Sequence, residues 1–164
     1  MSRLNSFLNR LTAQKKLIEH AAPLIDGVDG PIVDLGLGSG RSYDHLRQNL
    51  PDRSIFAFDR RVDAPPGFIP DAHHMIVGEI RETLQYCQPR IGTQAALIHN
   101  DLGTGDDLAN FCIAQWLGPL TNRLVATGGV ILTSFPMDLP RCSPLPLPTG
   151  IGQNRYHIYR CISE

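Results

Sequence analysis

The stretch IVDLGLGSGRSYDHL, residues 32–46, places three glycines within five positions, between an apolar run and a segment with helical character. Gly36, Gly38 and Gly40 allow sharp backbone turns and let the main chain approach a ligand closely. A helix that starts directly after them presents free amide groups, which favour an anionic group such as a carboxylate or a phosphate. The stretch therefore predicts a ligand-binding turn between a strand and a helix.

Apolar runs and helix-like segments alternate on both sides of this turn. Expected strands cover residues 31–36, 54–59, 73–78, 95–101 and 128–134, and expected helices cover residues 41–50, 79–87 and 106–124. Near-continuous apolar strands separated by helices are typical of a largely parallel sheet that is covered on both faces. The sequence therefore predicts a doubly wound α/β fold.

We expect one domain over residues 1–164, because this length suits a single hydrophobic core. An amphipathic helix is predicted over residues 2–22, ending near Pro23, and the cofactor-binding core over residues 31–134. The segment 135–154 is rich in proline, which lacks an amide donor, so we expect an extended loop there. Residues 155–162 alternate in polarity and predict a last strand at the sheet edge.

The glycine loop departs from two known fingerprints, and these departures narrow the range of ligands that it could bind. The dinucleotide pattern needs a third glycine where this sequence has Arg41, and the lysine of a phosphate-binding P-loop is absent. Asp59 ends an expected strand nineteen residues after Gly40, where a carboxylate accepts hydrogen bonds from ribose hydroxyls. Arg60 and Arg61 would suit a 2′-phosphate, but Asp59 would repel that group, so an unphosphorylated ribose fits better.

These segments resemble the class I methyltransferases that use S-adenosylmethionine (SAM). IVDLGLGSG (residues 32–40), with Asp34 before the glycines, is similar to their first motif, and FAFD (56–59) to their second. VGEIRETL (77–84) is similar to their third-strand segment, and ALIHNDLG (96–103) occupies the place of their fourth motif. The resemblance covers residues 31–134 and implies a Rossmann-like fold and transfer of a methyl group to an unidentified small-molecule acceptor.

The resemblance also implies roles for individual residues. Gly36, Leu37 and Gly38 would pass under the methionine part of SAM, and Asp34 would fix the loop and the ammonium group. The remaining candidates are Asp59 for the ribose, Arg60, Glu79 and Ile80 for the adenine, Arg41 and Ser42 for the carboxylate, and Tyr43 and Asp101 at the border of the cofactor. The expected product is S-adenosylhomocysteine.

Three residues at the end of the fourth strand are candidates for catalysis. Methyl transfer from a sulfonium is an in-line displacement, and a general base is needed only when the acceptor arrives protonated. Asp101 is the first choice, either to align the acceptor or to receive its proton, and His99 and Asn100 are the others. Because alternate strand residues point to opposite faces, only one or two of the three can face the site, and His99 could equally be a core histidine.

The sequence departs from the family pattern after the proline-rich segment. The family usually ends its sheet with two strands that form a hairpin, whereas only one strand is predicted here, so the sheet should be shortened at its C-terminal end. The acceptor site would then be completed by the N-terminal helix, the proline-rich loop or another subunit. The shortened sheet and the lack of a long insertion that would cap the substrate favour one alternative, a non-catalytic SAM-binding or scaffold protein. A nicotinamide-dependent oxidoreductase is weaker, because the third glycine is missing and the only lysines are Lys15 and Lys16.

Composition excludes several partners. The formal net charge of −1 and the lack of a long basic run argue against nucleic-acid binding. No apolar stretch reaches the roughly 20 residues that span a bilayer, and no signal peptide is recognisable, so a cytoplasmic location is expected. Four widely spaced cysteines and isolated carboxylates suggest no metal site. The amphipathic first helix and an exposed edge strand make a homodimer plausible.

Overall fold

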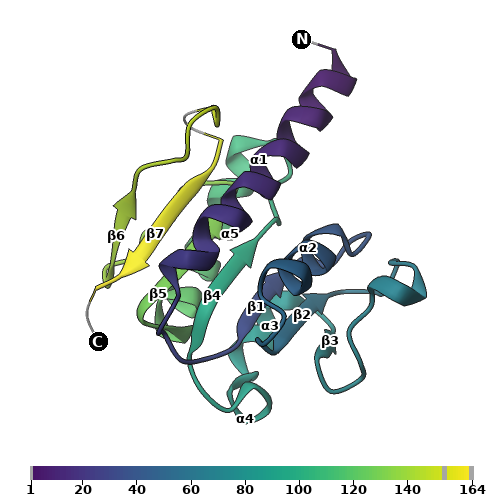
Figure 1. Ribbon diagram of the computed structural model, residues 1–164, viewed down its shortest axis with the longest axis vertical. Helices are drawn as coiled ribbons and strands as arrows, with labels where there is room; N and C mark the ends of the chain where they lie inside the picture. Colours follow the sequence, from purple (N-terminus) through teal and green to yellow (C-terminus); the bar gives the residue numbers. More distant parts are fainter. Residues whose placement is uncertain (1, 153–154, 163–164) are drawn as a thin grey trace.

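The computed structural model describes residues 2–152 and 155–162, and a seven-stranded sheet runs through it (Figure 1). The strand order is β3-β2-β1-β4-β5-β7-β6. Strands β1 to β5 are parallel, whereas β7 runs antiparallel to β5 and to β6. The strands are β1 (Ile32–Leu35), β2 (Ile55–Asp59), β3 (Met75–Val77), β4 (Ala95–Asn100), β5 (Val125–Thr133), β6 (Cys142–Leu145) and β7 (His157–Cys161). The predicted doubly wound α/β fold class is confirmed.

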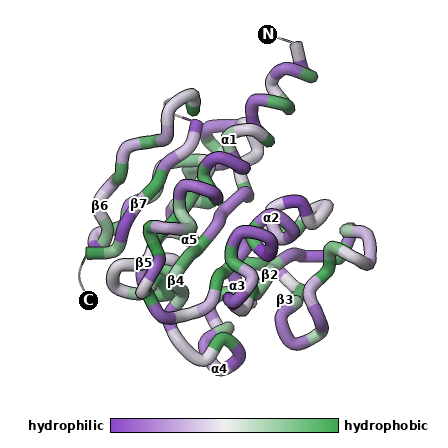
Figure 2. Tube along the Cα trace, in the orientation of Figure 1, coloured by the Kyte–Doolittle hydropathy of each residue, from purple (hydrophilic) through white to green (hydrophobic). Residues whose placement is uncertain are grey.

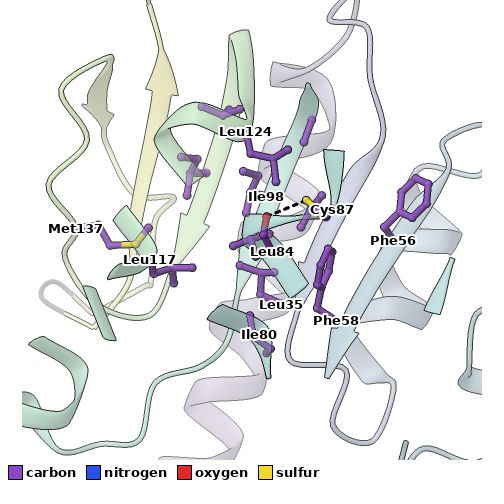
Figure 3. Close-up of a cluster of buried hydrophobic side chains, with 14 of the residues drawn as sticks. Leu35, Phe56, Phe58, Ile80, Leu84, Cys87, Ile98, Leu117, Leu124 and Met137 are labelled. Carbon is purple, nitrogen blue, oxygen red and sulfur yellow. Dashed lines mark hydrogen bonds between the residues drawn. The ribbon is translucent and has the colours of Figure 1, made fainter. Parts of the chain in front are cut away.

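Helices cover both faces of the sheet, because each strand carries apolar side chains on both sides. On one face, α1 (Arg3–Leu24) and α2 (Arg41–Asn49) pack on a buried cluster that includes Leu17, Leu46 and Leu97. On the other face lie α3 (Ile80–Gln85), α4 (Gln88–Ile91) and α5 (Asp107–Leu124). Figure 3 shows this second cluster, in which Leu117 and Leu124 of α5 lie near Leu35 and Ile98 of the sheet.

The first helix alternates hydrophobic and hydrophilic residues along its length (Figure 2). It buries Ala13, Leu17, Ile18 and Ala21, while Leu4, Phe7 and Leu8 in its first two turns are exposed. The helix ends at Leu24, two residues beyond the prediction, because the amide of Ile25 still donates to the carbonyl of Ala21 past Pro23. Its N-terminal turns project beyond the sheet (Figure 1).

The prediction of a sheet shortened at its C-terminal end is wrong. The expected loop over residues 135–154 contains β6, which pairs with β7 in an antiparallel hairpin. Pro144 lies in this strand, and an edge strand tolerates proline because one of its sides has no partner strand. Residues 153–154 of the expected loop lie outside the described residues.

Smaller differences concern the element boundaries. Strand β5 begins at Val125, three residues before the prediction, β7 spans five residues rather than eight, and α4 was not predicted. A 3₁₀ turn at Pro66–Phe68 follows β2. In the described part of the chain, no helix is both long and apolar enough to cross a membrane.

Backbone hydrogen bonds tie together the loops at the carboxyl ends of the parallel strands. The amides of Gly36 and Leu37 donate to the carbonyl of Phe58, at 2.9 and 3.3 Å. The amide of Asp101 donates to the carbonyl of Leu35 at 3.2 Å, and that of Gly78 donates to the carbonyl of Asp59 at 2.9 Å. The loops after β1, β2, β3 and β4 therefore form one connected edge, where ligands bind in open α/β sheets.

Candidate functional site

The glycine loop between β1 and α2 is a turn that only glycine fits well. Gly36, Gly38 and Gly40 all have positive φ angles, of +94°, +51° and +79°. A Cβ on Gly40 would lie 2.6 Å from both Cβ and the carbonyl oxygen of Phe68, so the loop around the 3₁₀ turn packs directly against it. A Cβ on Gly38 would meet nothing within 4 Å, which leaves this backbone open to a ligand. Leu37, between two of these glycines, is buried.

The Asp59 carboxylate supports the loop at its open point. Its Oδ2 accepts a hydrogen bond from the amide of Gly38 at 2.9 Å. Next to it, Arg60 and Glu79 approach each other at 3.9 Å with largely exposed side chains. Ile80, which follows Glu79, is buried in the cluster under α3. The structure thus places the candidates at the ends of β1, β2 and β3 at one edge of the sheet.

Asp34 does not reach the surface of this edge, because its side chain is fully buried. Oδ1 is 2.7 Å from Nδ1 of His99, and Oδ2 accepts a hydrogen bond from the hydroxyl of Ser42 at 3.0 Å. Burial alone would lower the pKa of His99, but the hydrogen bond and charge of Asp34, with a smaller effect from the charge of Asp101, raise it. Both carboxylate oxygens of Asp34 are therefore bonded to protein groups.

Asn100 and Asp101 have different environments. Asn100 is buried, donates from Nδ2 to the hydroxyl of Thr133 at 2.9 Å, and accepts at Oδ1 from the amide of Leu102 at 3.0 Å. These bonds fix the start of the loop after β4. Asp101 is partly exposed. Of the three predicted catalytic residues, Asp101 is thus the one with access to solvent.

Side chains from both ends of the chain border this edge, and the individual residues Phe7, Arg10 and Tyr156 were not among the predicted site residues. The guanidinium carbon of Arg41 lies 5.6 Å from the ring centre of Phe7 in α1. The hydroxyl of Tyr156 donates to the carbonyl of Arg10 at 3.4 Å. Burial, followed by the charge of Asp101, raises the pKa of Tyr156 to about 12. The amphipathic pattern of residues 2–22 indicated a packed helix but not which loop it would cover.

Tyr43, the last cofactor candidate in α2, packs between two apolar clusters, and the guanidinium carbon of Arg47 lies 5.5 Å from its ring centre. This contact accounts for its position without a ligand. Within residues 2–152 and 155–162, no group of three or more His, Cys, Asp or Glu side chains is arranged to hold a metal ion.

A shallow hollow at the opposite edge of the sheet has a structural explanation. It is lined by residues 22–26, except Leu24, and by residues 49–53. Arg53 donates there to the carbonyls of Val28, Gly30 and Ile25, at 2.6, 2.9 and 3.1 Å. The arginine thus holds the loop that leads into β1, and the hollow lies beside this contact.

Known methyltransferase structures have a fold similar to that of this chain. A structure of an S-adenosyl-L-methionine methyl transferase from Silicibacter pomeroyi DSS-3 is similar over 98% of this chain and 99% of that chain, with 39% identity and a TM-score of 0.91. CalS11, a TDP-rhamnose 3′-O-methyltransferase of calicheamicin biosynthesis, matches over 96% of this chain and 83% of its own, with 18% identity and a TM-score of 0.58.

TrmN from Thermus thermophilus is also similar, over 89% of this chain and 48% of its own, with 16% identity and a TM-score of 0.59. At such low identities, CalS11 and TrmN support the fold alone. None of the curated proteins compared matches this sequence significantly. Residues 1–161 match the sequence profile of a family described as S-adenosyl-L-methionine methyltransferase. The chain therefore belongs to the S-adenosyl-L-methionine methyltransferase family, enzymes whose methyl donor is SAM.

Proposed function

We propose that this enzyme binds SAM along the carboxyl edge of β1, β2 and β3 and transfers its methyl group to a small-molecule acceptor near Asp101. The observation that carries the proposal is the contact between Asp59 and the amide of Gly38, at the one loop glycine whose Cβ direction is open. This contact places the Asp59 carboxylate next to the open backbone of Gly38. SAM is a nucleoside joined to an amino acid, so the carboxylate suits its ribose and the backbone suits its methionine part.

The residues present fit the charges of SAM. No side chain caps the first turn of α2, whose N-terminus favours the carboxylate of the methionine part. We assign Asp59 to the ribose hydroxyls, and Arg60, Glu79 and Ile80 to the adenine. Asp34 and Ser42 act by shaping the loop, since their side chains bond to each other and Asp34 is buried.

Bound SAM supplies an electrophilic methyl group that the lone pair of an acceptor takes in one in-line displacement. The protein then has to hold the acceptor in line and exclude water. Asp101, partly exposed beyond the end of β4, is placed to orient an acceptor N–H or O–H or to take its proton. Asn100 contributes by fixing the loop that carries Asp101, through its bonds to Thr133 and Leu102.

A small acceptor fits the modest size and charge of this chain. The net charge of −1 provides no broad positive field for a nucleic acid. The similar protein CalS11 methylates a nucleotide-linked sugar, which illustrates a small acceptor on this fold. The cytoplasmic location and the homodimer stay predictions.

Calorimetry with SAM and S-adenosylhomocysteine tests the proposed site. Asp59→Asn should weaken binding about tenfold, a loss of about 1.4 kcal/mol, because the ribose loses a charged acceptor. Asp71→Asn is the matched control, because the Asp71 carboxylate also accepts backbone amides, those of His73 and His74, but lies before β3, at the opposite end of the strands. Equal losses in both variants, or no binding by the unmodified protein, would contradict the proposal.

The alternative of a non-catalytic SAM-binding or scaffold protein loses its main support. It rested on a shortened sheet and on the lack of a long insertion that would cap the substrate. The β6–β7 hairpin completes the sheet, which removes the first of these grounds. Transfer of label from methyl-labelled SAM to a cell extract tests turnover. The expected result is labelled product that forms more slowly with Asp59→Asn at limiting SAM and at the unmodified rate with Asp71→Asn. Tight binding without any product would favour the alternative.

A further inference from the structure

The buried pair of Asp34 and His99 stands out among the charged groups of the described residues. The two residues face each other across β1 and β4, in the parallel register that pairs Asp34 with His99. Their side chains are 0% and 4% exposed, and the two bonded atoms are 2.7 Å apart. A buried charge is costly unless it is paired and hydrogen-bonded, so the carboxylate oxygens of Asp34 need hydrogen-bond partners within the protein.

The second oxygen of Asp34 connects the pair to the glycine loop. Ser42 is the second residue of α2, and its hydroxyl donates to Oδ2 of Asp34 at 3.0 Å. The loop from Gly36 to Gly40 lies between these two residues in the sequence. One buried carboxylate therefore links the end of β1 before the loop to the helix start after it, and His99 on the neighbouring strand β4 holds that carboxylate.

The electrostatic surroundings of His99 favour its charged form. Burial lowers the pKa of His99, but Asp34 on β1 and Asp101 beyond β4 raise it, and their combined effect is the larger. The residue opposite His99 on β5 is the apolar Leu132. Near Asp101, burial and then the charge of Asp101 raise the pKa of the Tyr156 phenol, and the charge of the α1 residue Arg10 opposes that rise.

We propose that His99 is a positioning residue: paired with the buried carboxylate of Asp34, it holds the glycine loop in the form that binds SAM. It touches neither donor nor acceptor and acts through Asp34 and Ser42. The inference rests on the proposed SAM site, because it assigns a task to a pair lying beneath that site. It also explains why Asp34 is fully buried although it stands directly before the loop.

The charge state of His99 is measured independently of SAM. Side-chain nitrogen–proton correlation spectra of the free protein distinguish an imidazolium, with two protonated nitrogens, from a neutral ring. At neutral pH we expect His99 to be an imidazolium, and a neutral ring overturns the proposal. If the protein fails to bind SAM while His99 is charged, the proposed site fails and the charge state still stands.

The positioning role is read from SAM affinity as a function of pH in two proteins. His99→Gln keeps a donor for Asp34 but loses the charge, so its dissociation constant should be about tenfold higher near neutral pH. That ratio should approach one as the pH rises through the raised pKa of His99. The amino group of SAM titrates near pH 8 but contributes to both proteins, so the ratio cancels it. A ratio of one near neutral pH, or one that stays constant with pH, overturns the proposal.

Two further variants keep the test decisive if His99→Gln folds poorly. Ser42→Ala removes only the link between the pair and α2, and we expect about threefold weaker binding with a smaller pH dependence, because His99 acts on α2 through this link. His74→Gln is the control, because His74 forms an exposed pair with Asp71 at 2.9 Å before β3. It should leave SAM affinity unchanged. Unchanged affinity in Ser42→Ala would show that the pair does not act on the loop.

Discussion

At the scale of single residues, Gly38 tests whether the open backbone of the loop contacts SAM. Gly38→Ala forces an alanine into a left-handed conformation, at a cost of about 1 kcal/mol in folding free energy. Gly92→Ala is the matched control, because Gly92 also has a positive φ, with nothing within 4 Å of its Cβ direction. Both should lose similar stability in urea unfolding. Only Gly38→Ala should also weaken SAM binding, by about tenfold or more; equal affinities would contradict the assignment.

The same scale shows what the sequence could predict about the site. Glycines and carboxylates that follow parallel strands must meet at one edge, so spacing could predict that the glycine loop and Asp59 lie together. Glu79 was a candidate only through the resemblance to the methyltransferase family. The sequence could not show that Asn100 would bond to Thr133. That bond depends on the register of β4 against β5 and on which face each side chain takes. Asp34 was also a candidate, but its burial depends on the register of β1 against β4 and could not be predicted.

At the scale of elements, Arg53 connects the turn before β2 to the loop before β1. Arg53→Ala removes three hydrogen bonds to the carbonyls of Val28, Gly30 and Ile25 and leaves partly buried acceptors without a charged donor. We expect a loss of about 2 kcal/mol in the free energy of unfolding, measured with urea. Arg3→Ala, at an exposed position of α1, should cost far less. SAM affinity of folded Arg53→Ala should be unchanged, since Arg53 lies at the opposite edge.

Helices and strands were predictable where a pattern within the segment itself identifies them. They were less predictable where pairing with a distant strand determines the structure. The apolar runs of β1, β2 and β4 indicate buried strands, because a strand that is covered on both faces needs apolar residues at nearly every position. Strand β6 was missed because Pro144 argues against a strand in general, yet an edge position tolerates it. Its partner β7 lies more than ten residues further along the chain, so no hairpin turn signal marked the pair.

At the scale of the whole molecule, the Asp34–His99 pair should make stability depend on pH in a defined direction. The pKa of His99 is raised above its ordinary value of 6.5 in the folded protein. The folded state therefore holds this proton more tightly than the unfolded chain. The resulting stability is complete below about pH 6.5 and is lost as the pH rises through the raised pKa. Each unit of the rise corresponds to about 1.4 kcal/mol.

Urea unfolding of the unmodified protein and of His99→Gln, from about pH 6 to about pH 10, measures this dependence. The lowered pKa values of Glu19 and Asp71 act in the acidic range, because their contributions are lost as the pH falls, so they stay outside this window. The difference in unfolding free energy between the two proteins should be largest at the acidic end and shrink toward the alkaline end. A difference that grows with pH would mean that His99 is buried as a neutral ring, because burial without a charged partner lowers the pKa of histidine.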